Sequence, residues 1–246
     1  MILTRLIHSS STWVKKALPG YCGFCLSSRQ TSSGWCQECF DQLPWNNNGC
    51  WQCKEPLDSV SVAFNADTDP SQRVCGHCQE QPPAFTAATA ELLFDGPIRE
   101  LIHDFKFNAS PRAGMLLVEL MMAKAPSFLG EGLLPVPMHI ARARQRGFNQ
   151  SQWLAEQLGK RVKLPVIRAE CIKRLPSQRT LNRKERAKNL VGAFCIDKGP
   201  LPSHLTIIDD VVTTGATCQA LAEEALSAGA KRVDVWTVAR TPLVHN

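Results

Sequence analysis

The chain has 246 residues, 44% of them hydrophobic, and its 28 Lys and Arg against 22 Asp and Glu give a net charge of +6. Its uncharged hydrophobic stretches are shorter than the ~20 residues of a membrane-spanning helix, so the sequence predicts no transmembrane segment. Plentiful apolar residues with ordinary Gly and Pro contents exclude a disordered or collagen-like chain, and residues 1–20 lack the compact apolar run of a secretory signal.

Eight of the eleven cysteines lie between residues 22 and 78, in four pairs with the spacing C-x-x-C. A disulfide framework suits a secreted chain, and two intervening residues make a poor bridge within a pair. A tight C-x-x-C turn instead points two thiolates at one ion, and two such turns complete a tetrahedral zinc site with no open position for catalysis. The sequence therefore predicts two structural zinc ions, with the ligands Cys22, Cys25, Cys36, Cys39, Cys50, Cys53, Cys75 and Cys78.

The pairing of the four C-x-x-C turns has two solutions. Sequential pairing joins the first turn with the second and the third with the fourth, whereas a cross-braced arrangement joins the first with the third; we favour the sequential one. The large apolar groups of this region are mainly Trp35, Trp45 and Trp51, so metal binding must supply its folding energy. We expect an N-terminal segment (1–20), a double zinc ribbon (21–80) and a larger domain (85–246).

From about residue 86 the sequence alternates between strand-like and helix-like segments with short connections. Such alternation predicts an α/β fold with a parallel sheet covered by helices on both faces. The expected strands are 89–94, 132–137, 166–172, 205–208 and 232–239. The expected helices are 97–105, 112–124, 149–160 and 216–228, with a basic loop at 137–147 and a charged helix or mobile arm at 181–189.

Residues 205–217, LTIIDDVVTTGAT, carry the most specific pattern. A buried strand is expected to end in Asp209 and Asp210 at the carboxyl edge of the sheet, where open α/β folds bind ligands. The following turn and helix start offer backbone N–H groups to phosphate, and Gly215 allows a close approach. Carboxylates repel phosphate, so both Asp side chains should face sugar hydroxyls or Mg²⁺. The pattern favours a phosphorylated ribose over a plain acidic turn, with binding residues Val212, Thr213, Thr214, Gly215, Ala216 and Thr217.

These thirteen residues match the signature by which type I phosphoribosyltransferases bind phosphoribosyl pyrophosphate. With the cysteine pairs and three more stretches they make the whole chain resemble the competence-protein-F (ComF) family; the stretches are LPVPMH (134–139), RGFNQ (146–150) and the arm 178–194. The resemblance implies a type I phosphoribosyltransferase-like domain over 85–246 after the zinc ribbon, and Mg²⁺ bound with the sugar phosphate. It also implies a cytoplasmic bacterial protein acting in DNA uptake and natural transformation, with a DNA-uptake helicase or processing protein as a candidate partner.

The resemblance also assigns roles to charged residues. In that fold the loop after the first core strand binds pyrophosphate, and here it is 137–147, where Arg142 and Arg146 are the best placed because arginine offers paired donors and a permanent charge. It implies catalytic roles for Asp209, Asp210 and Arg146. Two classes of function stay open: a phosphoribosyltransferase with an unknown acceptor, and a non-catalytic single-stranded-DNA-binding or adaptor protein that uses the sugar-phosphate site as a sensor.

Positive charge is concentrated between residues 139 and 190, which hold 14 Lys and Arg against 3 Asp and Glu. A pyrophosphate group needs only a few of these cations. The surplus predicts sequence-independent binding of single-stranded DNA, with Phe148 or Trp153 as a surface on which bases stack.

Overall fold

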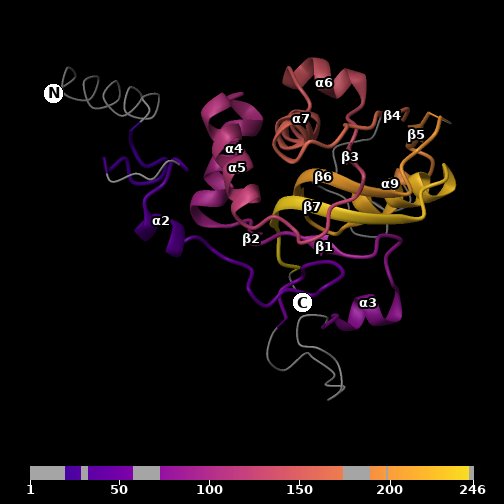
Figure 1. The fold of residues 1–246 in the computed structure, drawn as a ribbon, viewed down its shortest axis with the longest axis horizontal. Helices are drawn as coiled ribbons and strands as arrows, with labels where there is room; N and C mark the ends of the chain where they lie inside the picture. Colours follow the sequence, from indigo (N-terminus) through magenta and orange to yellow (C-terminus); the bar gives the residue numbers. More distant parts are fainter. Residues whose placement is uncertain (1–19, 29–32, 58–72, 174–188, 198, 244–246) are drawn as a thin grey trace.

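The computed structural model describes residues 20–28, 33–57, 73–173, 189–197 and 199–243. Its centre is a five-stranded parallel sheet in the order β1–β7–β6–β3, with β2 also paired to β7 (Figure 1). The predicted α/β fold with a parallel sheet is therefore confirmed. The strands are β1 (Ala88–Thr89), β2 (Leu92–Leu93), β3 (Gly132–Pro135), β6 (His204–Val212) and β7 (Arg232–Arg240).

Helices cover both faces of this sheet. Successive residues of a strand point to opposite faces, so Ile208 and Trp236 join one hydrophobic core with α4, α5 and α7, while Ile207 and Val235 join a second core with α9. Burial on both faces explains the nearly continuous apolar runs of β6 and β7. The covering helices are α4 (Gly96–Phe107), α5 (Pro111–Ala123), α7 (Gln150–Val162) and α9 (Ala216–Ser227).

The cysteine-rich region packs along one side of this α/β unit (Figure 1). Its first half, with the short helix α2 (Gln37–Asp41), contributes Cys22 and Trp35 to the core that contains α5. Its second half, with α3 (Gly76–Glu80), covers the edge of the sheet: Trp45 bridges Leu92 of β2, and the Ala88 N–H of β1 donates to the Trp51 carbonyl (3.3 Å). The domain boundaries 1–20, 21–80 and 85–246 stay a prediction.

The stretch expected to be a basic loop, 137–147, contains a helix, α6 (Ile140–Arg146). The prediction of a loop was wrong because the sequence IARARQR consists of good helix formers. The His139 ring accepts a hydrogen bond from the Ala141 N–H (3.2 Å) at its start, and Gly147, with φ of 93°, ends it. The arginines of this stretch therefore project from a helix.

Three strand predictions differ most from the structure in extent. The expected strand 89–94 is split into β1 and β2. Between them, Asn46 of the ribbon donates hydrogen bonds to the backbone carbonyls of Ala90, from its side chain, and Glu91, from its N–H, so these residues do not continue the strand. The expected strand 166–172 is reduced to β4 (Ala169–Cys171), which pairs antiparallel with an unexpected strand, β5 (Phe194–Ile196). The expected strand 205–208 continues to Val212 as β6. The arm expected at 181–189 falls largely outside the described residues.

None of the described helices is long and apolar enough to cross a bilayer.

Candidate functional site

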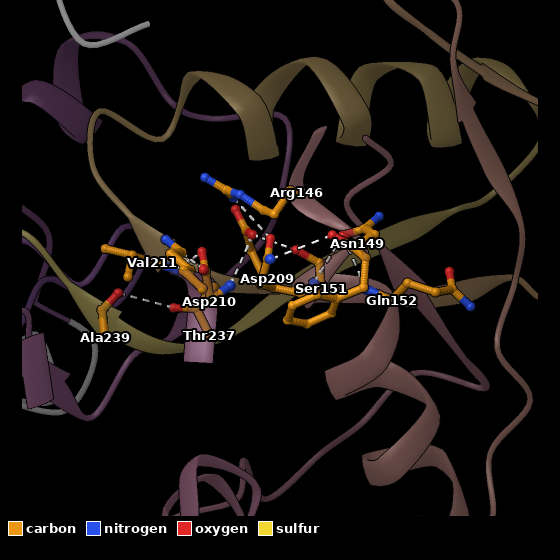
Figure 2. Close-up of polar contacts among 12 residues, drawn as sticks. Arg146, Asn149, Ser151, Gln152, Asp209, Asp210, Val211, Thr237 and Ala239 are labelled. Carbon is orange, nitrogen blue, oxygen red and sulfur yellow. Dashed lines mark hydrogen bonds and ion pairs between the residues drawn. The ribbon is translucent and has the colours of Figure 1, made fainter. Parts of the chain in front are cut away.

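Both acidic residues of the 205–217 segment lie inside strand β6, near its carboxyl end. Asp209 is partly buried, and its Oδ1 accepts a hydrogen bond from the Ser151 hydroxyl of α7 (2.8 Å) and from the Asp210 N–H (2.9 Å) (Figure 2). Asp210 is buried, with its Oδ2 2.5 Å from the ammonium of Lys106, the penultimate residue of α4. The helices α4 and α7 thus each supply a side chain that holds one of the two carboxylates.

The environment of this pair opposes a double negative charge. Burial raises the pKa of the Asp209 carboxyl to about 7, and the charge of Asp210 adds to the rise, whereas the Ser151 hydroxyl and the Lys106 ammonium lower it. Near neutral pH, Asp209 is therefore balanced between its two protonation states. Hydroxyl groups or a cation brought to this position would favour the ionised form.

This balance makes the stability of the fold depend on pH. A carboxyl whose pKa is raised from 3.8 to about 7 on folding binds more protons in the folded chain between those values, so its contribution to stability falls as pH rises through that window. We expect Asp209→Asn to stabilise the protein relative to wild type more at pH 8 than at pH 4. Urea unfolding at both pH values measures the difference. The exposed Asp197→Asn is the control, and a gain for Asp209→Asn that is equal at both pH values would contradict the assignment.

The turn after β6 leads into the N-terminus of α9. Gly215 is the residue before the helix and has φ of 78°, a left-handed conformation that favours glycine. A Cβ at this position would meet no atom within 4 Å, so the backbone is open to close approach. The Thr214 hydroxyl accepts from the Ala216 N–H (3.4 Å). The structure thus sets a helix N-terminus, which attracts anions, directly after the acidic pair.

The two arginines that the sequence singled out, Arg142 and Arg146, have different surroundings. Arg146 ends α6, donates to the Gln150 amide oxygen (3.0 Å), and lies over the ring of Phe107, 5.2 Å from its centroid. Gln150 precedes Ser151, so Arg146 contacts the same start of α7 that binds Asp209 (Figure 2). Arg142 is exposed, and its charge acts on the Cys171 thiol of β4, opposing the rise that burial causes in the pKa of that thiol.

Sequence reasoning missed two members of this site, Lys106 and Ser151. Lys106 follows Ile102 by four residues, so it lies on the inward face of α4, where a lysine needs an acidic partner. Ser151 lies in the first turn of α7, which Asn149 caps by accepting from the N–H groups of Ser151 (3.0 Å) and Gln152 (3.4 Å). Asn149 also donates to the Val136 carbonyl (3.0 Å), which ties this helix start to the end of β3.

The eight N-terminal cysteines form two groups of four. Within each group all four sulfur atoms lie within 4.8 Å of one another. Zinc–sulfur bonds of about 2.3 Å in a tetrahedron require sulfur separations of about 3.8 Å, and the Cys25–Cys36 and Cys53–Cys75 sulfur pairs are 3.7 Å apart. Both groups therefore fit zinc, and the predicted sequential pairing is confirmed: Cys22, Cys25, Cys36 and Cys39 form the first centre, and Cys50, Cys53, Cys75 and Cys78 the second.

Fold and side chains together define a parallel α/β protein with two N-terminal four-cysteine groups that fit zinc. No family model matches the chain. Among curated proteins it is 30% identical to "DNA utilization protein YhgH" of Salmonella typhi over 236 residues, covering 91% of this chain and 98% of that protein. It is 28% identical to "Competence protein F" of Haemophilus influenzae over 83% of this chain and 96% of that protein. The chain thus belongs to the ComF family of competence and DNA-utilization proteins.

Solved structures give a weaker likeness. Adenine phosphoribosyltransferase of Saccharomyces cerevisiae matches with a TM-score of 0.35 and 12% identity over 55% of this chain and 72% of that chain. Purine phosphoribosyltransferase of Pyrococcus horikoshii matches with a TM-score of 0.31 and 17% identity over 55% of this chain and 92% of that chain. At these scores the likeness carries no argument about the activity of this protein.

Proposed function

We propose that this ComF-family protein binds phosphoribosyl pyrophosphate with Mg²⁺ at the carboxyl end of β6 and acts in the use of imported DNA. One observation carries the first part: Asp209 and Asp210 lie near the carboxyl end of the buried parallel strand β6, and the Gly215 turn and the N-terminus of α9 follow directly after that strand. Such an arrangement provides acceptors for ribose hydroxyls and donors for a phosphate within a few residues. The names of the curated relatives support the second part.

The proposed roles follow from charge. Residues 212–217 bind the 5′-phosphate, Asp209 and Asp210 accept hydrogen bonds from the ribose hydroxyls, and Arg146 and Arg142 bind the pyrophosphate. Mg²⁺, when bound, neutralises pyrophosphate charge and so favours its departure. The Lys106 ammonium contacts Asp210 Oδ2 (2.5 Å) and so fixes the position of that side chain beside the ligand.

In a transfer reaction the bond between ribose C1 and the pyrophosphate oxygen breaks, and its electron pair leaves with pyrophosphate. A nucleophilic atom of the acceptor forms the new bond at C1. The chain's part in this step is positioning and charge stabilisation, since positive charge grows on the ribose and negative charge on the leaving group. The acceptor is not specified by these residues, so turnover has to be tested separately from binding.

Thermal unfolding with the ligand tests the proposal. Phosphoribosyl pyrophosphate with Mg²⁺ at 100 times its dissociation constant is expected to stabilise the folded chain by about 2.7 kcal/mol. Asp209→Asn and Asp210→Asn are each expected to remove most of this gain, because they weaken the acceptors for the ribose hydroxyls. Asp197→Asn, an exposed change of the same kind, should respond like wild type. A wild-type protein with no ligand-induced shift at millimolar concentration would show that the site is misread.

Pyrophosphate release distinguishes an enzyme from a sensor. Purified protein is mixed with phosphoribosyl pyrophosphate and a panel of free bases, and pyrophosphate is followed over time. Steady release with one acceptor supports a phosphoribosyltransferase. Binding without release in the presence of any acceptor supports the adaptor that uses the sugar-phosphate site as a sensor.

Binding of single-stranded DNA is a second candidate function, favoured by the charge of residues 139–190. Arg142, Arg144 and Arg168 are exposed on the described part of this region. Phe148 and Trp153, the expected stacking surface, are partly buried and pack against Phe105 at ring-centroid distances of 5.2 and 5.1 Å, so a base could reach only the remaining part of each ring.

We expect single-stranded DNA to bind without sequence preference and with an affinity that falls steeply with salt, because neutralised phosphates release counterions. Reversing the charge of Arg183, Lys184 and Arg186 together is expected to weaken it; these residues lie outside the described ranges. Fluorescence anisotropy of a labelled oligonucleotide at several salt concentrations measures both effects. If the affinity for the oligonucleotide does not change with salt, or if no binding is detected at low salt, the surplus positive charge serves a ligand other than single-stranded DNA.

A further inference from the structure

A buried ion pair joins the second four-cysteine centre to the carboxyl end of β7. Glu55, which is 5% exposed, accepts from Nε (3.0 Å) and Nη2 (2.6 Å) of Arg240, which is 1% exposed, through its Oε2. The other carboxylate oxygen, Oε1, accepts from the Leu243 N–H (2.8 Å). The two paired residues are 185 positions apart in the sequence.

Glu55 is held by the metal-binding turn itself. It follows Cys53 by two residues, and its backbone carbonyl accepts from the N–H of Cys50 (2.7 Å), a ligand of the second centre. Lys54 between them has φ of 56°, which turns the chain. The conformation of Glu55 is therefore set by the same loop that carries two of the four thiolates.

Arg240 lies beside the proposed phosphate-binding turn. It is paired in register with Val212, the last residue of β6, and the next N–H along the chain, that of Thr241, donates to the Val212 carbonyl (2.9 Å). Residues 213–215 start directly after Val212. The Nη1 atom of Arg240 is buried and makes no hydrogen bond within the described part of the chain. The guanidinium is therefore positioned by Glu55 alone among its charged neighbours in that part.

The first metal centre makes contacts of another kind. Cys22 and Cys36 pack in the core that contains α5, and Arg112 of α5 donates to the Tyr21 carbonyl (3.1 Å) beside that centre. The chain thus contains two four-cysteine centres of the same chemistry, one packed on α5 and the other joined to the end of β7. A ligand substitution at the first centre can therefore serve as the control for the same substitution at the second centre.

We propose that the second four-cysteine centre, acting through Glu55 and Arg240, holds the 213–217 turn in its binding conformation, so that metal at this centre raises affinity for the sugar-phosphate ligand. Glu55 and Arg240 are positioning residues in this scheme. Loss of the metal releases Glu55, Arg240 loses its partner, and the end of β6 gains freedom. The part that concerns ligand affinity rests on the proposed function, whereas the part that concerns the turn does not.

Amide hydrogen exchange tests the proposal without any ligand. Cys53→Ser and Cys39→Ser each remove one partly buried ligand, from the second and the first centre respectively. We expect Cys53→Ser to speed exchange in peptides covering 213–217 by about tenfold, within the usual range of coupling between two sites, while Cys39→Ser changes it less than about twofold. A peptide from β3 serves as the internal control against general unfolding. Equal effects of the two variants on 213–217, or none, would overturn the proposal.

Glu55→Gln separates the ion pair from the metal. It keeps all eight thiolates, so zinc content stays at that of wild type while exchange at 213–217 rises. Lys54→Gln, which removes only the neighbouring ion pair with Glu91 (2.8 Å), is the matched control and should leave 213–217 unchanged. Should Cys53→Ser fail to fold, this pair of variants decides the question, and an unchanged turn in Glu55→Gln overturns the proposal.

The dissociation constant of phosphoribosyl pyrophosphate with Mg²⁺, measured by calorimetry on the same proteins, tests the link to affinity. We expect about tenfold weaker binding in Glu55→Gln and wild-type binding in Lys54→Gln. Failure of the proposed function shows as no binding to the wild type, with the exchange results still readable. Failure of the coupling shows as equal binding to wild type and Glu55→Gln.

Discussion

Cys50→Ser is expected to remove zinc from the second four-cysteine centre and to unfold the segment around it. The hydrophobic cluster of this segment consists, among the described residues, of its four cysteines with Leu57 and Val74. Structural zinc contributes about 10–16 kcal/mol to the folding of small zinc domains, whereas burying one aliphatic side chain contributes about 1.5–3 kcal/mol. The metal is therefore the main source of stability here, and no neighbouring packing can replace it.

Zinc content and limited proteolysis measure this effect. The wild-type chain is expected to carry two zinc ions and the Cys50→Ser variant one, with new cleavage between residues 44 and 80. The Cys195→Ser change, at an exposed cysteine outside both centres, should keep both ions and the wild-type cleavage pattern. Two ions in Cys50→Ser, or a freshly purified wild type without metal, would refute the assignment of the eight ligands.

Local patterns predicted the metal centres and the main helices well. A C-x-x-C turn fixes the relation of two thiolates within four residues, so the eight ligands could be named from spacing. The stripe of Ile98, Ile102 and Phe105 similarly predicted α4, because residues three and four apart share one helix face. The strand that escaped prediction, β5, and the two into which the expected strand 89–94 is split, β1 and β2, have two or three residues each, which is too short for a periodic signal.

The part of the site that the sequence could not predict consists of contacts between distant parts of the chain. The sequence placed Asp209 and Asp210 at the end of a strand that the structure continues to Val212, and it did not identify the Lys106 and Ser151 side chains that hold them. Spacing along one helix or strand says which face a residue occupies and nothing about which other element packs there. A charge at the end of a buried strand, such as Arg240, predicts that a partner exists; its identity as Glu55 depends on how the ribbon packs on the sheet.

The Glu55–Arg240 pair leads to a second large effect, on the stability of the whole fold. Removing one member of a buried ion pair leaves an uncompensated charge and costs about 3–5 kcal/mol. We expect this loss in Arg240→Met, measured by urea unfolding. Arg232→Met is the matched control at the other end of the same strand: Arg232 pairs with Asp234 (3.0 Å) but its side chain is 46% exposed, so its loss should cost at most about 1 kcal/mol.

The double variant Glu55→Leu with Arg240→Met separates the cost of the unpaired charge from the value of the pair. Two apolar residues of similar volume remove both charges, and such replacements are neutral or stabilising by up to about 4 kcal/mol in other buried pairs. The double variant is therefore expected to recover most of the stability that Arg240→Met loses. If the losses of the two single variants simply add, the two side chains do not act as a pair, and the link between the second metal centre and the end of β7 must be carried by the backbone.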